Sequence, residues 1–363
     1  MPKPLLDIWS TGVDAVRGGT SVHAALPLID TPVDTILAVG KAACDMAAPA
    51  MTAYPKADTT IVTKHDHSTP LPRAAQIIEA GHPIPDAASL RGGQALRDAI
   101  AKCHPNTHVL MLVSGGASAV AELLPDGMTL TDWQKATQDL MASGADIHEI
   151  NTYRKSISLI KGGRLLAGFG GARVTTLAIS DVEGDGLDVI GSGIAMAPPA
   201  PVFDFTAHIV ASNERARQAC AAAADANVII NTENLYEDVQ SLAPKLGDIL
   251  KSGPAGLYIF GGEPTVELPA NPGRGGRNQA LALLLAREIA GRSDLEILVA
   301  GTDGSDGPTP DAGGIVRGTT WGEGAQDALN RADAGNFLAQ KDALLRTGPT
   351  GTNVMDLVIA RKS

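Results

Sequence analysis

The chain is 363 residues long, more than one ordinary hydrophobic core accommodates, so two domains are expected. Its formal net charge of −11 argues against nucleic acid or an anionic membrane surface as the main partner. The three cysteines form no C-x-x-C pair and the N-terminus lacks the apolar core of a signal peptide, so a cytoplasmic protein is expected. The densest apolar run, 280–286, is far too short to span a bilayer.

Predicted strands and helices alternate along the first half of the chain. An amphipathic helix opens it, with apolar residues at helical spacing from Leu5 to Val16. The segment 64–86 is predicted to be loop-like at both ends, and its prolines disfavour a helix. Strands are predicted at 35–39, 59–63, 108–113 and 174–179, and helices up to about 53 and at 87–103, 131–142 and 146–160.

The second half repeats this alternation after a proline-rich boundary at 200–206. Alternating strands and helices imply sheets with parallel strands and right-handed crossovers. We therefore predict an α/β protein with two domains, 1–206 (Rossmann-like) and 207–363, each a parallel or mixed sheet flanked by helices. In the second domain, strands are predicted at 208–211, 227–230, 257–260, 265–268, 297–300 and 354–360, and helices from 213 and at 233–251, 279–290, 323–331 and 336–345.

Two loops bring carboxylates to the ends of predicted strands. The strand 297–300 leads into a glycine-rich loop with Asp303, Asp306 and Asp311, and the strand 174–179 leads into Ser180-Asp181. Carboxylates in such positions can hold a divalent cation or accept a hydrogen bond from a substrate hydroxyl. A solvated turn is the alternative. Neither loop is an EF-hand, because the twelfth position holds Ser192 in one and Gly314 in the other.

Three glycine-rich segments are suited to bind an anion. Glycines let backbone N–H groups approach a phosphate, and a helix that begins there adds a favourable dipole. An ordinary turn with a serine cap is the alternative for the first segment. The candidate binding residues are Ser114, Gly115, Gly116 and Ser118 in the first segment, Asn151, Lys155, Lys161, Gly162 and Gly163 in the second, and Gly275, Gly276 and Asn278 in the third.

Cations accompany these segments. Arg274 and Arg277 flank the third glycine pair, and Asn278 is predicted to cap a helix that begins at Gln279. Guanidinium groups there favour phosphate or carboxylate. Lys41 follows a predicted strand, where α/β sheets bind ligands, although a capping or solvated lysine is the alternative. Neither a Walker A motif nor G-x-G-x-x-G occurs in the chain.

Taken together, the motifs resemble one family. VSGGASA, SGADIHEINTYRKSISLIKGGRL, AISDVEGDGLDVIGSG, GGEPTVEL, GRGGRNQALAL and GTDGSDGPTPDAGG occur in the order typical of glycerate 2-kinases with a C-terminal MOFRL domain, and GKAACDMA and EAGHPIPDAAS also match. The resemblance covers nearly the whole chain and places the MOFRL region at about 256–361. In two respects the chain departs from the family: Ile194 follows Ser192-Gly193 where a proline is usual, and the chain is shorter around 225–256.

The resemblance implies an active site in a cleft between two α/β domains, where the γ-phosphoryl of ATP is transferred with Mg²⁺ to D-glycerate to give 2-phosphoglycerate. It places the family's suspected catalytic lysine and arginine on Lys41 and Arg277. Asp181 is the third catalytic candidate, and Asp181, Asp303 and Asp306 are the candidates for Mg²⁺. An NAD(P)H-dependent hydroxypyruvate reductase and a non-catalytic sugar-phosphate binder are the alternatives. Small-molecule substrates are expected, without nucleic acid or membrane, and a homodimer is left open.

Overall fold

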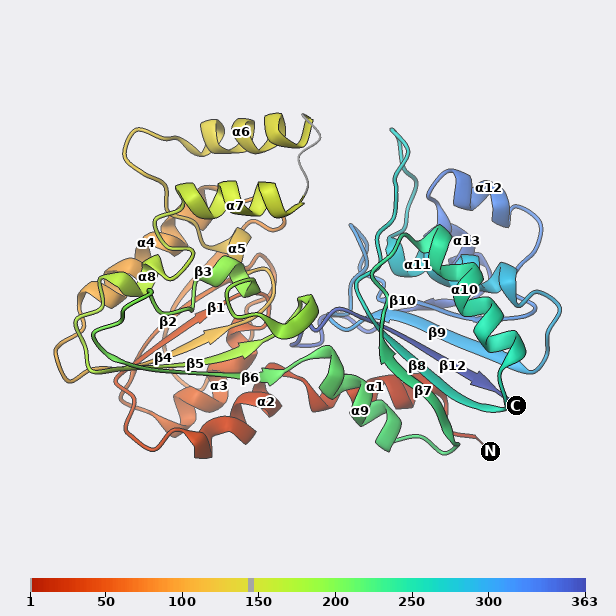
Figure 1. Cartoon of the computed structure of the whole chain (residues 1–363), viewed down its shortest axis with the longest axis horizontal. Coiled ribbons are helices and arrows are strands. Elements are labelled where there is room, and N and C mark those ends of the chain that lie inside the picture. Colours follow the sequence, from red (N-terminus) through yellow and green to blue (C-terminus); the bar gives the residue numbers. More distant parts are fainter. Residues whose placement is uncertain (1, 143–146) are drawn as a thin grey trace. The chain divides into compact units, whose positions relative to one another are not determined.

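The computed structural model describes residues 2–142 and 147–363, with the side chains of 141, 142 and 147–151 left out. The chain forms two compact units (Figure 1). Residues 17–211 make the N-terminal unit, and residues 1–16 together with 212–363 make the C-terminal unit. The first helix, α1 (Leu5–Ala15), therefore belongs to the C-terminal unit. A single domain boundary near residue 206 does not describe this discontinuous unit.

The N-terminal unit is built on a parallel sheet with the strand order β3-β2-β1-β4-β5-β6. Its order reverses between β1 and β4, and in doubly wound sheets ligands bind at the carboxyl ends of the strands on either side of such a reversal. The strands are β1 (Thr35–Val39), β2 (Asp58–Lys64), β3 (Gln76–Ala80), β4 (His108–Val113), β5 (Arg173–Ile179) and β6 (Asp204–Ala211).

Helices cover both faces of this sheet, as Figure 1 shows. On one face lie α2 (Gly18–Ala25) and α3 (Ala43–Ala53), and on the other α4 (Ala87–Ala101), α5 (Ala117–Val120) and α8 (Arg164–Ala167). Asp86 begins α4 with a reciprocal capping box, in which its side chain accepts from the Ser89 backbone N–H at 3.0 Å. Two further helices, α6 (Leu130–Ala142) and α7 (Ile147–Ile157), pack against each other.

The C-terminal unit contains a mixed sheet with the order β11-β10-β9-β12-β8-β7. The neighbours β7 and β8 are parallel, and all other neighbouring strands of this sheet are antiparallel. The prediction of parallel or mixed sheets flanked by helices is thus confirmed in both units. The strands are β7 (Val228–Glu233), β8 (Gly256–Gly262), β9 (Leu295–Gly301), β10 (Gly313–Arg317), β11 (Leu344–Leu345) and β12 (Asp356–Lys362).

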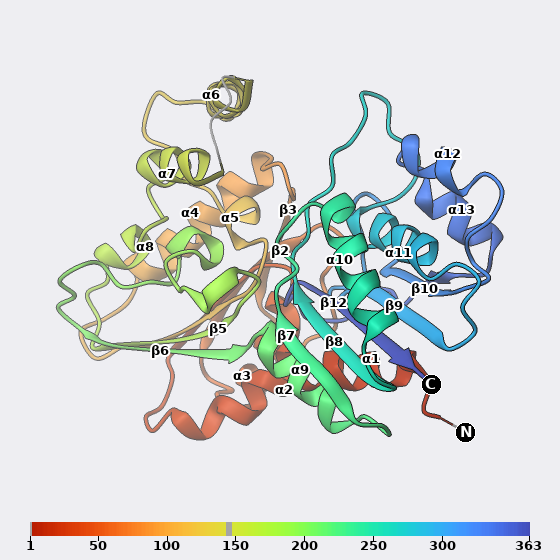
Figure 2. The same cartoon turned by 45° about the vertical axis from the view of Figure 1, so that its right-hand side comes forward.

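One buried helix organises the core of this unit. In α11 (Arg277–Glu288), every residue from 281 to 286 is fully buried, and the helix packs on β9, β10 and α10 (Val239–Ser252). Figure 2 shows α10 and α11 on one face of the sheet, with α12 (Ala325–Asn330) and α13 (Ala334–Gln340) beyond them. On the other face, α1 packs on α9 (Asn213–Ala222), where a Cβ on Gly12 would lie 2.3 Å from the Cys220 sulfur.

Some sequence predictions differ from this architecture. A strand at 265–268 is wrong, since Thr265 makes an isolated bridge to Asp238. The strand predicted at 208–211 in the second domain is part of β6, which belongs to the N-terminal unit. The sequence did not predict β3, which pairs with β2 within the segment 64–86, or β10. Within the part of the chain that the structure describes, no helix combines the length and the apolar character needed to cross a membrane.

Candidate functional site

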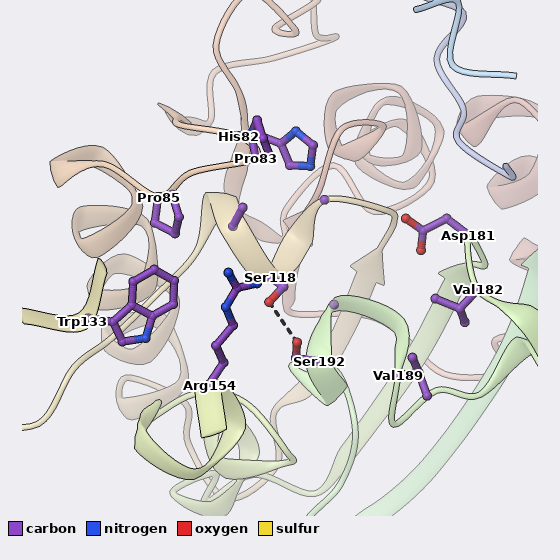
Figure 3. A pocket seen from close by; sticks show the side chains of 13 residues that line it. His82, Pro83, Pro85, Ser118, Trp133, Arg154, Asp181, Val182, Val189 and Ser192 are labelled. Atoms are coloured by element: carbon purple, nitrogen blue, oxygen red, sulfur yellow. Dashed lines mark hydrogen bonds between the residues drawn. The ribbon is translucent and has the colours of Figure 1, made fainter. Parts of the chain in front are cut away.

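A cavity of about 280 Å³ lies in the N-terminal unit. Its walls come from the turn after β4, the exits of β5 and the loop 81–86 (Figure 3). Proline, valine and tryptophan side chains form its apolar walls, and its polar side chains are His82, Ser118, Arg154, Asp181 and Ser192. The cavity therefore lies at the carboxyl ends of the strands, where doubly wound folds bind ligands.

The turn after β4 packs against two basic side chains, His82 and Lys41. Gly116 has a φ of 82°, and a Cβ there would lie 3.1 Å from Cδ2 of His82 and 3.1 Å from Cγ of Lys41. The Lys41 backbone N–H donates to Gly115 O at 2.9 Å, which ties the end of β1 to the turn. A side chain at position 116 would be strained by this φ and would crowd both His82 and Lys41, so a glycine favours the arrangement.

The helix that follows this turn is short. It ends at Val120, so α5 has four residues and contributes little dipole to an anion at its start. The Ser118 hydroxyl lies 2.9 Å from that of Ser192, which joins α5 to the loop after β5. Ser192 has a left-handed φ of 58°, and its hydroxyl faces the cavity in Figure 3.

Asp181 and Arg154 lie on opposite sides of the cavity (Figure 3). Asp181 follows β5 directly, as predicted, while Arg154 was not among the predicted site residues. The guanidinium carbon of Arg154 lies 5.4 Å from the centre of the Trp133 ring. Burial lowers the pKa of Arg154, and the negative charge of Glu122 opposes that shift. The sequence signal for Arg154 was its place in a segment already predicted to bind anions.

Lys161 does not line the cavity and lies behind Trp133 in a buried polar cluster, with its amino group 5.9 Å from the centre of the Trp133 ring. Its amino group pairs with Glu122, and both side chains are fully buried. The Ser158 hydroxyl donates to the other oxygen of Glu122. Burial lowers the pKa of Lys161 and Glu122 counteracts this shift. The charge of Lys161 is therefore satisfied inside the fold, and a contact with a phosphate would require this pair to open.

The two predicted glycine cradles differ in this unit. The N–H groups of Gly162 and Gly163 donate to the carbonyls of Ser192 and Gly193, each at 2.9 Å, so they hold the cavity loop in place. By contrast, no backbone carbonyl of a described residue accepts from the N–H group of Gly115 or Gly116. Lys155 donates to Asp188 O at 2.6 Å, and the side chain of Asn151 lies outside the described residues.

In the C-terminal unit, the start of α11 is already occupied by a carboxylate of the chain. Asp306 accepts from the backbone N–H groups of Asn278 and Gln279 at 3.0 and 2.8 Å. The prediction that Asn278 caps a helix beginning at Gln279 is wrong, because α11 begins at Arg277 with Gly276 as its N-cap. Burial raises the pKa of Asp306 to about 6, against the lowering effect of these N–H donors.

Arg277 is held by two carboxylates. Its Nε lies 2.6 Å from Oδ2 of Asp356 and its Nη1 lies 2.7 Å from Oε1 of Glu263. Burial disfavours the charge, but Asp356 and Glu263 outweigh it and raise the pKa of Arg277. Arg274 and Arg346 likewise share the buried carboxylate of Asp311. Both predicted arginines, Arg274 and Arg277, thus form ion pairs within the C-terminal unit.

The third predicted metal ligand, Asp303, lies in the turn after β9. Its Oδ1 accepts from the backbone N–H and the hydroxyl of Ser305, each at 2.9 Å. Asp303 and Asp306 belong to the C-terminal unit, and Asp181 belongs to the N-terminal unit. Among the described residues, no group of three or more His, Cys, Asp or Glu side chains is arranged to hold a metal ion.

Comparisons with known proteins agree with this architecture. Residues 4–225 match the family described as Domain of unknown function (DUF4147), and residues 256–356 match the MOFRL family. A D-glycerate 2-kinase of Thermotoga maritima is 35% identical over 99% of this chain and 98% of its own length. A putative hydroxypyruvate reductase of Agrobacterium vitis is 35% identical over 89% of this chain and 97% of its own length.

Solved structures give the same result. A crystal structure of the Thermotoga maritima glycerate kinase has a TM-score of 0.89 at 34% identity and covers 99% of this chain and 98% of that one. A structure of a Pyrococcus horikoshii protein has a TM-score of 0.80 at 31% identity, with 99% and 97% covered. The fold defines a two-unit α/β protein with a cavity at the carboxyl ends of the strands of its N-terminal sheet. The chain belongs to the glycerate 2-kinase family that combines the DUF4147 and MOFRL domains, which confirms the resemblance.

Proposed function

We propose that the chain is a glycerate 2-kinase, which transfers the γ-phosphoryl of ATP to the C2 hydroxyl of D-glycerate and releases 2-phosphoglycerate and ADP. The observation that carries the proposal is the cavity at the carboxyl ends of the strands, lined by Asp181 after β5 and Gly116 after β4, with Lys41 after β1 packed beside Gly116. The names of the relatives support the substrate and the acceptor position.

Phosphoryl transfer depends on positioning and on neutralising charge more than on covalent chemistry by the protein. In the N-terminal unit, Lys41 supplies a positive charge beside the turn, and the N–H groups of Gly115 and Gly116 supply donors for phosphate oxygens. Asp181 accepts a hydrogen bond from the attacking hydroxyl or holds the cation. Arg277 acts in the C-terminal unit, where Asp356 and Glu263 orient its guanidinium.

Oxygen donors of the kind that Mg²⁺ prefers line the cavity, namely the Asp181 carboxylate and the Ser118 and Ser192 hydroxyls. When bound with ATP, Mg²⁺ neutralises charge on the phosphate oxygens. Of the predicted ligands, we favour Asp181, followed by Asp303. Asp306 is the weakest candidate because both its oxygens already accept from the start of α11.

A hydroxypyruvate reductase is the second candidate, since some relatives carry that name. Doubly wound sheets often bind dinucleotides, which makes the alternative reasonable for this strand order. However, the turn after β1 is Gly40-Lys41-Ala42-Ala43, which has one glycine in place of the three that approach a pyrophosphate. The local sequence therefore disfavours a nicotinamide cofactor.

Incubating the purified protein with D-glycerate and Mg-ATP, and separately with hydroxypyruvate and a reduced nicotinamide cofactor, distinguishes the candidates. We expect ADP and a phosphorylated acid with Mg-ATP, and phosphorus NMR with scalar coupling to the C2 proton identifies 2-phosphoglycerate. Formation of 3-phosphoglycerate would contradict the acceptor position. Reduction of hydroxypyruvate by NADH or NADPH, without phosphorylation, would overturn the proposal.

A further inference from the structure

Arg154 lines the cavity and forms no ion pair within the part of the chain that the structure describes. Among the described residues, its buried Nε has no hydrogen-bond partner. Glu122 is the carboxylate that influences its charge, and Glu122 is already paired with Lys161 and bonded to Ser158. A partly buried guanidinium without an internal counter-charge is stabilised when an anion enters beside it.

The surroundings of Arg154 hold its side chain in place. Its guanidinium stacks against Trp133, whose side chain is 3% exposed. The next residue of α6, Gln134, donates to Pro85 O at 3.0 Å, which anchors the helix to a loop that also lines the cavity. Figure 3 shows the guanidinium pointing toward Ser118 inside the cavity. Because the group is held before a ligand arrives, little side-chain entropy is lost on binding.

The size and composition of the cavity favour a small acid. At about 280 Å³ it is slightly smaller than the 300–1,000 Å³ typical of sites for drug-sized ligands. The planar fork of a guanidinium matches a carboxylate with two parallel hydrogen bonds. The Ser118 and Ser192 hydroxyls lie in the same cavity and can bond to substrate hydroxyls. Donors for phosphates are available elsewhere, at Lys41 and the Gly115–Gly116 turn.

We propose that Arg154 is a substrate-specificity residue, which binds the carboxylate of the three-carbon hydroxy acid and so orients it for phosphorylation. The identity of this acid rests on the function proposed above. The interaction of Arg154 with a carboxylate rests on the cavity alone.

The variants Arg154→Met and Arg154→Lys test this role in steady-state kinetics, with D-glycerate and ATP varied separately. We expect Arg154→Met to raise KM for D-glycerate about tenfold to a hundredfold, as expected when a charge-assisted pair is lost, while KM for ATP changes less than twofold. Arg154→Lys should fall between the two, because lysine keeps the charge but not the fork. The matched control is Arg91→Met, at an exposed position of α4, which should behave as the unmodified protein.

An increase in KM for ATP with an unchanged KM for D-glycerate would show that Arg154 binds phosphate, and would overturn the carboxylate assignment. Unchanged values for both substrates would overturn any role in recognition. Thermal unfolding of each variant verifies that it is folded. If Arg154→Met fails to fold, Arg154→Lys decides, because the lysine side chain can still pack on Trp133.

Calorimetric titration without ATP separates this inference from the proposed kinase activity. The unmodified protein should bind D-glycerate more tightly than glyceramide, its neutral amide, and Arg154→Met should remove most of that preference. If the protein binds D-glycerate through Arg154 but does not phosphorylate it, the kinase proposal fails and the inference stands. If it phosphorylates D-glycerate and Arg154→Met keeps the preference for the acid over the amide, the inference fails alone.

Discussion

Glycines and charged residues gather at the ends of strands in both units, but the two units use these charges differently. In the N-terminal unit, Arg154 and Asp181 line a cavity on opposite sides, and Arg154 has no carboxylate partner among the described residues. In the C-terminal unit, Arg277 is paired with Asp356 and Glu263, and Asp306 caps α11. A glycine-rich charged loop therefore indicates either a ligand site or an internal electrostatic network. The two are distinguished by whether the charged side chains already have ion-pair partners within the fold.

The largest effect is expected from neutralising the cavity carboxylate. Asp181→Asn keeps the shape of the side chain but removes the charge that would orient the hydroxyl or hold Mg²⁺. We expect kcat for D-glycerate phosphorylation to fall about a hundredfold to a thousandfold, as for other losses of one preorganised electrostatic contact. The melting temperature should change little, because Asp181 lies at a cavity.

Steady-state kinetics and thermal unfolding of Asp181→Asn measure the two quantities. Glu183→Gln is the matched control, since Glu183 lies two residues further along the same loop and is exposed. If Asp181→Asn keeps near-normal kcat, the cavity carboxylate is a turn residue. The contrast between a ligand site in one unit and internal ion pairs in the other then fails for Asp181.

The same substitution should lower stability far more in the C-terminal unit than in the N-terminal unit. Arg277→Met leaves the Asp356 carboxylate, which is 2% exposed, without its charged donor. We expect the free energy of unfolding to fall by about 3 kcal/mol, as when a buried ion pair is broken on one side. Arg154→Met breaks no ion pair among the described residues and should cost less than about 1 kcal/mol.

Urea denaturation of both variants checks this contrast. Similar losses in the two variants would mean that Arg154 is also held by internal charges. Little loss in Arg277→Met would mean that its ion pairs contribute to function and not to the stability of the C-terminal unit.

The smallest effect concerns pH. The folded-state pKa of Asp306, about 6, lies above its ordinary value of 3.8. Between these values the folded chain keeps a proton that the unfolded chain releases, so this group lowers the free energy of unfolding as the pH rises through that window. The contribution should be about 1–3 kcal/mol, and it is fully present only below the unfolded-state pKa.

Urea denaturation from pH 4 to 7, with a chelator present, compares the unmodified chain with Asp306→Asn. Other carboxylates titrate in both proteins, so the difference between the two curves isolates Asp306. We expect the curves to diverge most between pH 4 and 6, and parallel curves would contradict a raised pKa at this residue.

Much of the fold could be predicted because buried strands and amphipathic helices have strong local patterns. The strands at 35–39 and 108–113 coincide with β1 and β4. The sequence could not show β3, whose residues are half-exposed at a sheet edge between prolines, or β10, which begins with two glycines. These strands form because a neighbour offers backbone partners, which is a property of the tertiary structure.

The site was harder to predict because four nearby cations have the same local signal and different partners. Lys161 is buried against Glu122, Lys155 donates to the Asp188 carbonyl, and Arg164 donates to the Ser158 carbonyl at 2.8 Å. Arg154 alone of the four lines the cavity, among the described residues. The partner of Lys161, Glu122, lies more than thirty residues earlier in the chain, so the local sequence does not reveal this pairing. The functional roles of the predicted site residues, and the location of an active site between two domains, stay predictions.

The membership of α1 in the C-terminal unit has a consequence for synthesis on the ribosome. Its apolar residues Leu5, Ile8, Trp9 and Val13 leave the ribosome well before the elements on which they pack, which are α9 and β12, the latter ending at Lys362. At about 5–20 residues per second, this apolar face waits on the order of tens of seconds for its last partner strand. The N-terminal unit can fold in that interval, while the first helix stays exposed to chaperones and to other nascent chains.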